Sequence, residues 1–583
     1  MKQGKNRRLA NVKTRRETGL DYIMFNLDLN TPFGKKQLKE IQAYYPGEEE
    51  ELRQELNRVD RMIEFVKQNQ VLTDKIQEVF MEVKDPSLTV QRSGSATLST
   101  VELYEVKSLL LQMRQLRKLT IEHEIGDYKG SHCISECKKI NQSGEEEKLI
   151  FQINENEPIV NTVPEEYFLE DTEDLLDDLD PRGDRLNTFY IYDEFSSLLG
   201  EYRAQKREYE LLIRKEQKQT REELRRKHGV MLTPKFDIVV AKSHPDFEKI
   251  QGLDELEIVD QDYMSVTMQL KPTEKIYNYV SEVEKINSEI EIEEERIREE
   301  LSRKISKKSE VILHNCDKMG ALDLALAKAI YSIKHDLTKP EIVDEHIVEF
   351  EDGRNLQVED IIKSKGKEYC PISLSLKDGV TLITGANMGG KTISLKLAGQ
   401  IPILAQYGFF VPAKYARVGL SSYMQILIGD SQSVERGLSS FGSEMEELKE
   451  ILDHGQENSL ILIDEIASGT NPTEGTALTK SLVDYLIEKP YISLITTHFE
   501  SVTEREGVIN MQVRGLADCN FTLLNREIQH ANRRDRINII SKYMDYRLCR
   551  VDNEAQVPKD ALSIAAMLGI DKAIIDGAKK YIR

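Results

Sequence analysis

The sequence predicts a multidomain protein in which a mainly α-helical region precedes an α/β domain. Three observations lead to this prediction. The chain has 583 residues, too many for one hydrophobic core. Its first 340 residues carry helical periodicity and long charged stretches. From about residue 341, short β-rich apolar runs alternate with helical stretches, which is typical of a sheet with helices on its faces.

Residues 1–125 are expected to form an N-terminal helical region. The sequence Asn30-Thr31-Pro32 predicts a helix that begins at or just after Pro32. The first 16 residues carry seven Lys and Arg and no acid, but they lack the apolar stretch of a signal peptide. No apolar run approaches the length of a membrane span, so no membrane partner is expected.

Six cysteines in this length indicate a reducing compartment, and we expect a cytoplasmic protein. Cys133 and Cys137 are the only close pair, and their spacing matches no common zinc site. We interpret them as ordinary thiols, with a metal site as a distant alternative.

Residues 126–270 combine an acidic, irregular insert with a long charged helix. The segment 165–180 holds nine acids in sixteen residues, and we interpret it as a solvated helix face or a disordered loop. Residues 189–229 predict one long helix closed by Gly229. The net charge of −21 argues against a surface that binds phosphate throughout, but residues 201–228 hold ten basic and six acidic residues. A local basic groove therefore stays possible.

Residues 271–340 are expected to form a returning helix that begins near Pro272. A helix of thirty residues spans roughly 45 Å, which suits a lever or strut rather than a compact core. The alternating four-three spacing of a packed seam leaves its partner open, either within the chain or in a second chain. The seam residues are Ile276, Val280, Val283, Ile290, Ile297 and Leu301.

The α/β region, placed at 341–530, contains GANMGGKT, which matches the P-loop pattern in full. Glycines let successive backbone N–H groups converge on phosphates, and the following helix directs its N-terminus at the same anion. Lys391 would add a charge near the β- and γ-phosphates, and the Thr392 hydroxyl would bind Mg²⁺. The predicted nucleotide-binding residues are Gly385, Ala386, Asn387, Met388, Gly389, Gly390, Lys391 and Thr392.

A second apolar run, LILIDE, ends in Asp464 and Glu465. Asp464 would hold Mg²⁺ through water, and Glu465 would orient and deprotonate the attacking water. A third run ends at His498, which we expect to sense the γ-phosphate, although a lone His there is also typical of a capping or core residue. Ser439 and Ser440 stand at a predicted helix N-terminus and suit a γ-phosphate held by another subunit.

At this point the motifs resemble the MutS family of ATPases. TGANMGGKT, SSFGSEM and LILIDEIASGTNPTEG resemble its P-loop, its trans-acting serine motif and its Asp-Glu strand with the following loop. LDYIMFNLDLNTPF resembles the start of its core domain, and DALSIAAMLGIDKAIIDGAKKYI resembles its C-terminal helices.

The resemblance implies an ABC-type P-loop ATPase domain at 341–530, preceded by levers and a clamp of long helices and followed by a C-terminal helical dimerisation segment at 531–583. It also implies ATP rather than GTP, and a homodimer with two composite ATP sites. Lys391, Thr392, Asp464 and Glu465 would act in cis, and Ser439 and Ser440 would reach the partner's nucleotide.

Several features depart from the family pattern. The chain begins almost directly at the core domain, so direct mismatch reading is not expected, and Phe80-Met81-Glu82 carries no weight as a wedge. The motifs are closer to the family's second branch, which suppresses recombination or acts on stalled ribosomes, but its C-terminal nuclease domain is not expected here. Ala386 replaces the usual proline, and residues 353–360 lack the usual Arg-His-Pro, which leaves the adenine contacts open.

Two hypotheses for function follow. The first is an ATP-driven clamp on branched or duplex DNA, with the basic helix 201–228 as the contact surface. The second is a protein-remodelling ATPase, similar to reactivating factors of adenosylcobalamin-dependent amino-acid aminomutases, and the acidic insert motivates it. A chromosome-condensing or break-repair ATPase is set below both, because the helices are too short for its coiled arms.

Overall fold

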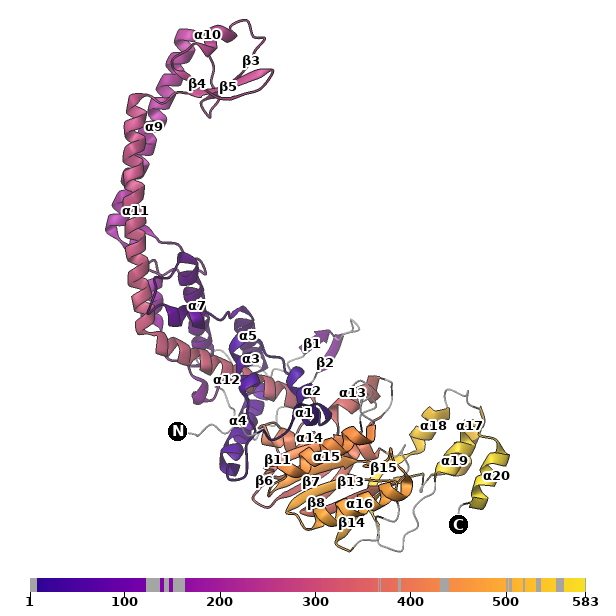
Figure 1. Cartoon of the computed structure of the whole chain (residues 1–583). Helices are drawn as coiled ribbons and strands as arrows, with labels where there is room; N and C mark the ends of the chain where they lie inside the picture. Colours follow the sequence, from indigo (N-terminus) through magenta and orange to yellow (C-terminus); the bar gives the residue numbers. More distant parts are fainter. Residues whose placement is uncertain are drawn as a thin grey trace. The chain divides into compact units, whose positions relative to one another are not determined.

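A computed structural model of the chain describes residues 8–121, 137–140, 146–149, 163–364, 366, 368–385, 390–429, 440–499, 502, 506–516, 519–530, 536–551 and 560–581. It divides into two compact units (Figure 1). The first unit comprises Met1–Gln77, Glu124–Tyr167 and Met319–Arg583, and the second comprises Glu78–His123 and Phe168–Lys318.

The N-terminal part of the first unit is helical, with α3 beginning at Pro32 as predicted. The Thr31 side chain accepts the Gly34 N–H and so caps this helix. Thr31 also donates from its backbone N–H and its hydroxyl to the buried Asp323 carboxylate, each at 2.7 Å. The helices of this part are α1 (Val12–Glu17), α2 (Leu20–Phe25), α3 (Pro32–Glu40) and α4 (Glu49–Gln68), while α5 (Gln70–Glu82) and α12 (Ser309–Lys334) cross the boundary between the units.

A six-stranded sheet forms the centre of the first unit, in the order β11-β12-β13-β9-β14-β15. All neighbours are parallel except β14 and β15. The carboxyl ends of the parallel strands therefore meet at one edge, which is where ligands bind in open α/β sheets. The strands are β9 (Gly379–Thr384), β11 (Tyr423–Ile428), β12 (Ser459–Asp464), β13 (Tyr491–Thr496), β14 (Val508–Gly515) and β15 (Asp545–Arg550).

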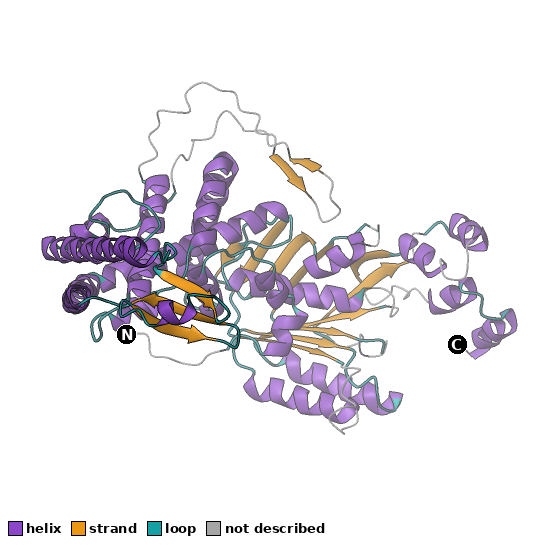
Figure 2. Cartoon of the chain, turned by 90° about the horizontal axis from the view of Figure 1, so that it is seen from above, coloured by secondary structure: helices purple, strands orange, loops and turns teal. Residues whose placement is uncertain are grey.

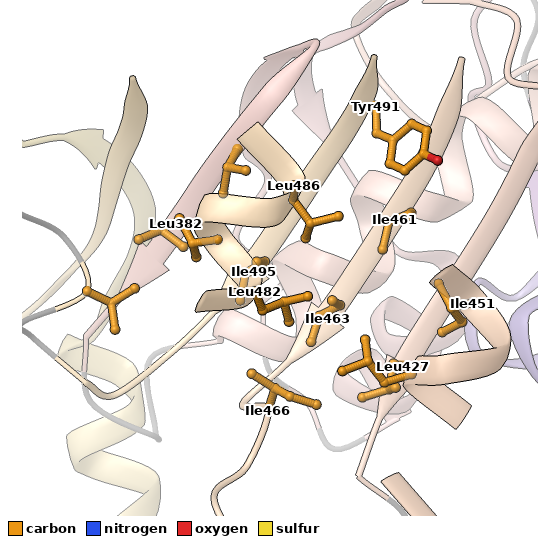
Figure 3. Close-up of a cluster of buried hydrophobic side chains, with 14 of the residues drawn as sticks. Leu382, Leu427, Ile451, Ile461, Ile463, Ile466, Leu482, Leu486, Tyr491 and Ile495 are labelled. Atoms are coloured by element: carbon orange, nitrogen blue, oxygen red, sulfur yellow. The ribbon is translucent and has the colours of Figure 1, made fainter. Parts of the chain in front are cut away.

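Helices lie along both sides of these strands (Figure 2). On one face, α15 (Ser440–His454) and α16 (Pro472–Ile487) pack on a buried apolar cluster (Figure 3). Burying each such Leu or Ile side chain contributes roughly 1.5–3 kcal/mol. On the opposite face, Gly399 of α14 (Lys391–Gln406) approaches so closely that an added Cβ would lie 2.9 Å from the Leu462 side chain. The labelled cluster residues are Leu382, Leu427, Ile451, Ile461, Ile463, Ile466, Leu482, Leu486, Tyr491 and Ile495.

The first unit also holds a four-stranded sheet of order β6-β10-β7-β8, and helices near the C-terminus. Its strands are β6 (Glu341–Val343), β7 (Ile347–Gly353), β8 (Ile372–Lys377) and β10 (Tyr415–Gly419), with α13 (Leu356–Ser364) between β7 and β8; β1 (Cys137–Ile140) and β2 (Glu146–Leu149) pair separately. The later helices are α17 (Phe521–His530), α18 (Arg536–Tyr543), α19 (Asp560–Met567) and α20 (Lys572–Tyr581). Among the described helices, none has the length and apolarity needed to cross a bilayer.

Two long helices, α9 (Ser197–His228) and α11 (Glu274–Lys307), run side by side in the second unit (Figure 1). Both follow from capping signals: Thr273 accepts the Ile276 N–H, and Gly229 ends α9 with a left-handed φ of 73°. The predicted helix 189–229 begins only at Ser197, because the Ser196 side chain caps it by accepting the Leu199 N–H.

Helix α11 lies beside α9 of the same chain, so it has a partner within the chain. Arg203 pairs with Glu294 at 2.7 Å, Lys275 pairs with Glu216 at 3.4 Å, and the rings of Tyr209 and Tyr279 lie 6.0 Å apart. Of the predicted seam, Ile276, Ile297 and Leu301 are buried, whereas Val280 is 38% exposed.

The sequence did not predict the small antiparallel sheet between the two long helices. Its order is β3-β5-β4, and it packs with the end of α9 around Val266 and Met268. It comprises β3 (Asp237–Ala241), β4 (Leu256–Gln261), β5 (Ser265–Leu270) and α10 (Phe247–Gln251), and the unit also contains α6 (Ser87–Arg92), α7 (Thr100–Thr120) and α8 (Glu173–Leu179).

The acidic stretch 165–180 is in large part the solvated helix face that was one of the two interpretations, because of its nine acids only Asp180 is buried. Its second half forms α8, which buries Leu175, Leu176 and Leu179. Its acids pair with the basic side chains of α7, of α11 and of the neighbouring loops: Glu173 with Arg114, Asp171 with Arg117, Asp174 with Lys308, Asp178 with Lys304, and Asp180 with Lys107 and Arg185. The negative charge is thus largely compensated inside the second unit.

Candidate functional site

The predicted phosphate loop lies between β9 and α14, at the carboxyl edge of the six-stranded sheet. Gly385 and Gly390 take φ values of 128° and 80°, which favour glycine. At Gly390 an added Cβ would also lie 3.1 Å from the Tyr546 ring of β15. The predicted residues Ala386, Asn387, Met388 and Gly389 lie outside the described residues.

Lys391, at the start of α14, and Glu465, directly after β12, are brought together. Lys391 begins α14 with a side chain that is 3% exposed, and its Nζ lies 2.9 Å from Glu465 Oε1. The same Nζ donates to the Gly385 carbonyl at 2.8 Å. The ammonium group is therefore held next to the Gly385 carbonyl and beside the predicted base.

Thr392 and Asp464 also meet, as expected for two groups that serve one metal ion. The Thr392 hydroxyl donates to Asp464 Oδ2 at 2.7 Å, and the Thr496 hydroxyl donates to Oδ1. Thr496 ends β13, which lies between β9 and β12. No role was predicted for Thr496, whose only local signal in the sequence was its place at the end of an apolar run.

The loop after β12 departs from ordinary backbone geometry. Glu465 and Ala467 adopt left-handed φ values of 47° and 58°, which cost non-glycine residues about 1 kcal/mol or more each. The Glu465 N–H donates to the carbonyl oxygen and to the hydroxyl of Thr496, each at 3.1 Å. Such strain is typical of functional loops that the surrounding structure holds in place.

The other side chains that the sequence singled out show no contact with Lys391, Thr392, Asp464 or Glu465 within the described residues. His498 is exposed just beyond β13, and its contact within the described residues is with the ring of Phe499, at 4.2 Å. Ser440 is the first residue of α15, while Ser439 lies outside the described residues. Cys133 also lies outside them, and no cluster of three or more metal-binding side chains occurs within them.

A cavity of about 520 Å³ lies beside β15. Asp545 and Arg547 line it, and Tyr546 between them packs against Gly390. The cavity mixes apolar and hydrogen-bonding groups, as small-molecule sites do. Its other lining residues include Cys370, Pro371, Cys519, Tyr543 and Met544, none of which the sequence indicated.

A Ser-His-Asp arrangement elsewhere in the first unit has a structural role. His346 Nδ1 lies 2.7 Å from Asp378 Oδ1, and His346 Nε2 lies 3.3 Å from Ser421 Oγ. Ser421 is completely buried, and Gln406 bonds both its N–H and its carbonyl. A substrate has no access to that hydroxyl, so the chain of hydrogen bonds fixes β7 and β8 rather than activating a nucleophile.

Helix α9 carries a stripe of basic side chains along one exposed face. Arg207, Arg214, Lys218 and Arg225 follow one another at spacings of seven, four and seven residues, which place them on nearly the same side of the helix. None of the four forms an ion pair within the described residues, unlike Arg203 and Lys227 of the same helix. This α9 basic stripe consists of Arg207, Arg214, Lys218 and Arg225.

Comparison with known proteins agrees with these observations. The family model of MutS domain V, an ATPase domain, matches residues 381–581. The chain is 31% identical over 405 residues to "Endonuclease MutS2" of Shouchella clausii, which covers 67% of this chain and 47% of the relative. It is 35% identical over 262 residues to "Endonuclease MutS2" of Clostridium botulinum strain Okra, covering 44% of this chain and 32% of that protein.

A third relative, "Endonuclease MutS2" of Caldanaerobacter subterraneus subsp. tengcongensis, is 29% identical over 330 residues, which covers 56% of this chain and 38% of the relative. The chain thus spans less than half the length of these relatives. These matches indicate the same family as the P-loop sequence and the adjacent Asp464 and Glu465. The chain belongs to the MutS family.

Proposed function

We propose that this chain is an ATPase that couples ATP binding and hydrolysis to the opening and closing of a dimeric clamp on branched or duplex DNA. One observation carries the ATPase part: the end of β9 and the end of β12 bring Lys391 beside Glu465 and Thr392 beside Asp464. These are the four groups that phosphoryl transfer to water needs in cis.

The Thr392 hydroxyl and the Asp464 carboxylate fit Mg²⁺, because this ion prefers hard oxygen ligands and keeps several waters. Their 2.7 Å contact keeps both oxygens at one point of the strand edge. Mg²⁺ would supply charge stabilisation at the phosphoryl oxygens. Thr496 holds the second oxygen of Asp464 and so fixes the orientation of this carboxylate.

Glu465 and Lys391 would change partners during the reaction. Phosphate oxygens compete with Glu465 for the Lys391 ammonium, which frees the carboxylate. Glu465 would then accept a proton from water while the water oxygen bonds to the γ-phosphorus. The bond from that phosphorus to its bridging oxygen breaks, which yields ADP and phosphate.

We also infer an ABC-type P-loop fold, a homodimer with composite ATP sites, and trans roles for Ser439 and Ser440. The strand order supports the fold, because β13 separates the P-loop strand β9 from the Asp464 strand β12. The start of α15 at Ser440 supports the trans role, since free N–H groups at a helix N-terminus suit a phosphate. His498, exposed at the same strand edge, is proposed to sense the γ-phosphate.

The cavity beside β15 is proposed to hold the adenine base. Asp545 and Arg547 line the cavity, and Tyr546, which stands between them on β15, lies next to Gly390, so one strand borders both the cavity and the start of α14. Pro371 and Met544 offer apolar surface for a flat ring, and Tyr543 and Cys519 add polar groups.

DNA is the proposed partner, and two observations favour it over a protein client. The α9 basic stripe offers four cations without ion-pair partners within the described residues. The names of the relatives state that they are endonucleases, which act on nucleic acid. The acidic stretch that suggested an aminomutase client is instead compensated by basic residues of its own unit.

Two assays test this function. Steady-state ATP hydrolysis by the purified chain should require Mg²⁺ and stop in EDTA. DNA binding should fall sharply with salt, and glutamine at all four stripe positions should reduce the salt slope by about 0.9 for each phosphate that the protein no longer neutralises. Glutamine at the paired residues Arg203 and Lys227 is the matched control and should leave the slope nearly unchanged. An ATPase that binds no DNA would direct the search to a protein client such as an aminomutase.

A further inference from the structure

Helix α15 contacts two segments that lie far from it in the sequence. Glu444 Oε1 accepts the Ala467 N–H at 3.3 Å, in the loop that follows the catalytic pair. One turn later, Glu447 Oε2 lies 2.7 Å from Lys13 Nζ. The same Lys13 Nζ donates to the Ile428 carbonyl at 3.2 Å, at the end of β11. One helix therefore joins the Glu465 loop to the N-terminal segment.

The Glu465 loop needs such support because its backbone is strained at two residues, Glu465 and Ala467. The Glu465 N–H donates a hydrogen bond to the Thr496 hydroxyl, and the Ala467 N–H donates one to Glu444 Oε1. The backbone of α16 closes in behind, since a Cβ on Gly475 would lie 2.8 Å from the Ala467 carbonyl oxygen. Removal of the Glu444 acceptor would therefore leave Ala467 free to relax toward an ordinary φ.

Lys13 is a fixed anchor because the N-terminal segment is bonded to the edge strand β11. The Leu9 carbonyl accepts the Met424 N–H at 2.7 Å. The buried Thr14 hydroxyl accepts the Ile426 N–H at 3.1 Å and donates to Gln425 Oε1 at 2.8 Å. Any displacement of α15 must therefore stretch its contact with Lys13.

The charges on α15 are coupled through the same lysine. Burial raises the pKa of Glu444, and the nearby Glu447 acts in the same direction. The Ala467 N–H and the Lys13 ammonium oppose this rise in pKa. Lys13 thus acts on both carboxylates, directly on Glu447 and through space on Glu444.

We propose that Glu444 and Lys13 are positioning residues for ATP hydrolysis: Lys13 fixes α15 against β11, and Glu444 transmits the position of α15 to the backbone that carries Glu465. This inference rests on the proposed function. Because α15 begins at Ser440, a change at that end of the helix would alter the placement of the catalytic carboxylate of the same chain.

The first test compares two substitutions of Glu444 in the full chain. Glu444→Gln keeps an oxygen acceptor for the Ala467 N–H, whereas Glu444→Ala removes it. Loss of one hydrogen bond corresponds to roughly a 2- to 10-fold change. We expect Glu444→Ala to lower kcat by that factor with KM for ATP unchanged, and Glu444→Gln to restore most of the rate.

The second test compares Lys13→Met with Arg15→Met on the same helix. Arg15 forms an ion pair with Asp21 at 2.7 Å, and within the described residues no hydrogen bond or ion pair joins its side chain to α15, so it is the matched control. Lys13→Met should lower kcat while Arg15→Met leaves it near the wild-type value. The exchange Lys13→Glu with Glu447→Lys should recover part of the loss. Lys13→Met combined with Glu444→Ala should lose less than the product of the two single effects, because both act through α15.

A third readout does not depend on hydrolysis. Hydrogen exchange of the amides at 465–470 should be faster in Glu444→Ala than in Glu444→Gln or the wild type. Equal exchange in all three, or equal kcat in Glu444→Ala and the wild type, would overturn the inference. A wild-type chain that neither binds nor hydrolyses ATP would instead contradict the proposed function, and the exchange data would still decide whether Glu444 holds the loop.

Discussion

Lys391 and Glu465 carry opposite charges and form an ion pair at the proposed ATP site. Their 2.9 Å contact places a buried ammonium beside the proposed base. The arrangement keeps the lysine within reach of the loop through its bond to the Gly385 carbonyl. We expect each residue to serve a different step, and substitutions should separate the two steps.

Lys391→Ala should weaken ATP binding roughly 10- to 150-fold, because a hydrogen bond to a charged group contributes about 1.5–3 kcal/mol. Glu465→Gln should still bind ATP but hydrolyse it roughly 10²- to 10⁴-fold more slowly, since it removes the general base. Titration with a fluorescent ATP analogue and single-turnover phosphate release measure the two steps separately. Wild-type turnover in Glu465→Gln would show that another group is the base.

The site residues that could be predicted from the sequence are those that belong to short contiguous motifs. Lys391, Thr392, Asp464 and Glu465 each stand at a strand end or helix start, and the parallel sheet brings such positions to one edge. Thr496, Glu444 and Lys13 had no comparable signal, because their roles depend on contacts between segments more than twenty residues apart.

Among the elements, α8 shows why charge alone is a poor guide to structure. Asp180 and Lys107 are 0% and 1% exposed at the side chain and lie 3.2 Å apart. Burial alone would raise the pKa of Asp180, but the Arg185 N–H and Lys107 hold it below its ordinary value. Asp174 of α8 pairs with Lys308 on the surface, where its side chain is 61% exposed.

Asp180→Ala should therefore destabilise the second unit by about 3–5 kcal/mol, because it leaves a buried lysine without its partner. Asp174→Ala removes the same charge from α8 itself, which Asp180 directly follows, but should cost about 0–1 kcal/mol. Urea unfolding followed by circular dichroism compares the two variants. Equal losses would mean that the acidic stretch acts only through its total charge.

The contact between α9 and α11 should depend on pH through Glu293. Arg296 and the Ser196 hydroxyl lower the pKa of this buried carboxyl from 4.5 to about 2. Because the pKa in the folded state is the lower one, the contribution to stability is present above pH 4.5 and is lost as the pH falls toward 2.

The difference in unfolding free energy between wild type and Glu293→Gln should accordingly be largest above pH 5 and shrink toward pH 2.5. Thermal or urea unfolding at several pH values measures this difference. The other carboxyls titrate alike in both proteins, so their contributions cancel when the two unfolding free energies are subtracted. A difference that grows as the pH falls would have the wrong sign for a carboxyl whose pKa is lowered by folding.

The two long helices were predictable, because capping residues and a regular seam lie within each of them. The sheet β3-β5-β4 was not, since most residues of β4 are exposed and do not alternate. The ion pairs of the acidic stretch 165–180 could not be predicted either, because its basic partners lie on α7 and α11 and in the loops beside α8.

For the whole molecule, the central claim is that the proposed ATPase acts on DNA. The first unit holds the proposed ATP site, and the α9 basic stripe of the second unit is the proposed surface for DNA. The net charge of −21 makes that surface local, so binding should depend on salt more than on sequence.

The most direct test is steady-state ATP hydrolysis by the purified chain, with and without duplex, branched and single-stranded DNA at fixed salt. We predict Mg²⁺-dependent hydrolysis that duplex or branched DNA stimulates, with the stimulation lost as salt is added. A rate that no DNA changes would contradict the DNA clamp and favour a protein client. No hydrolysis under any condition would contradict the ATPase itself.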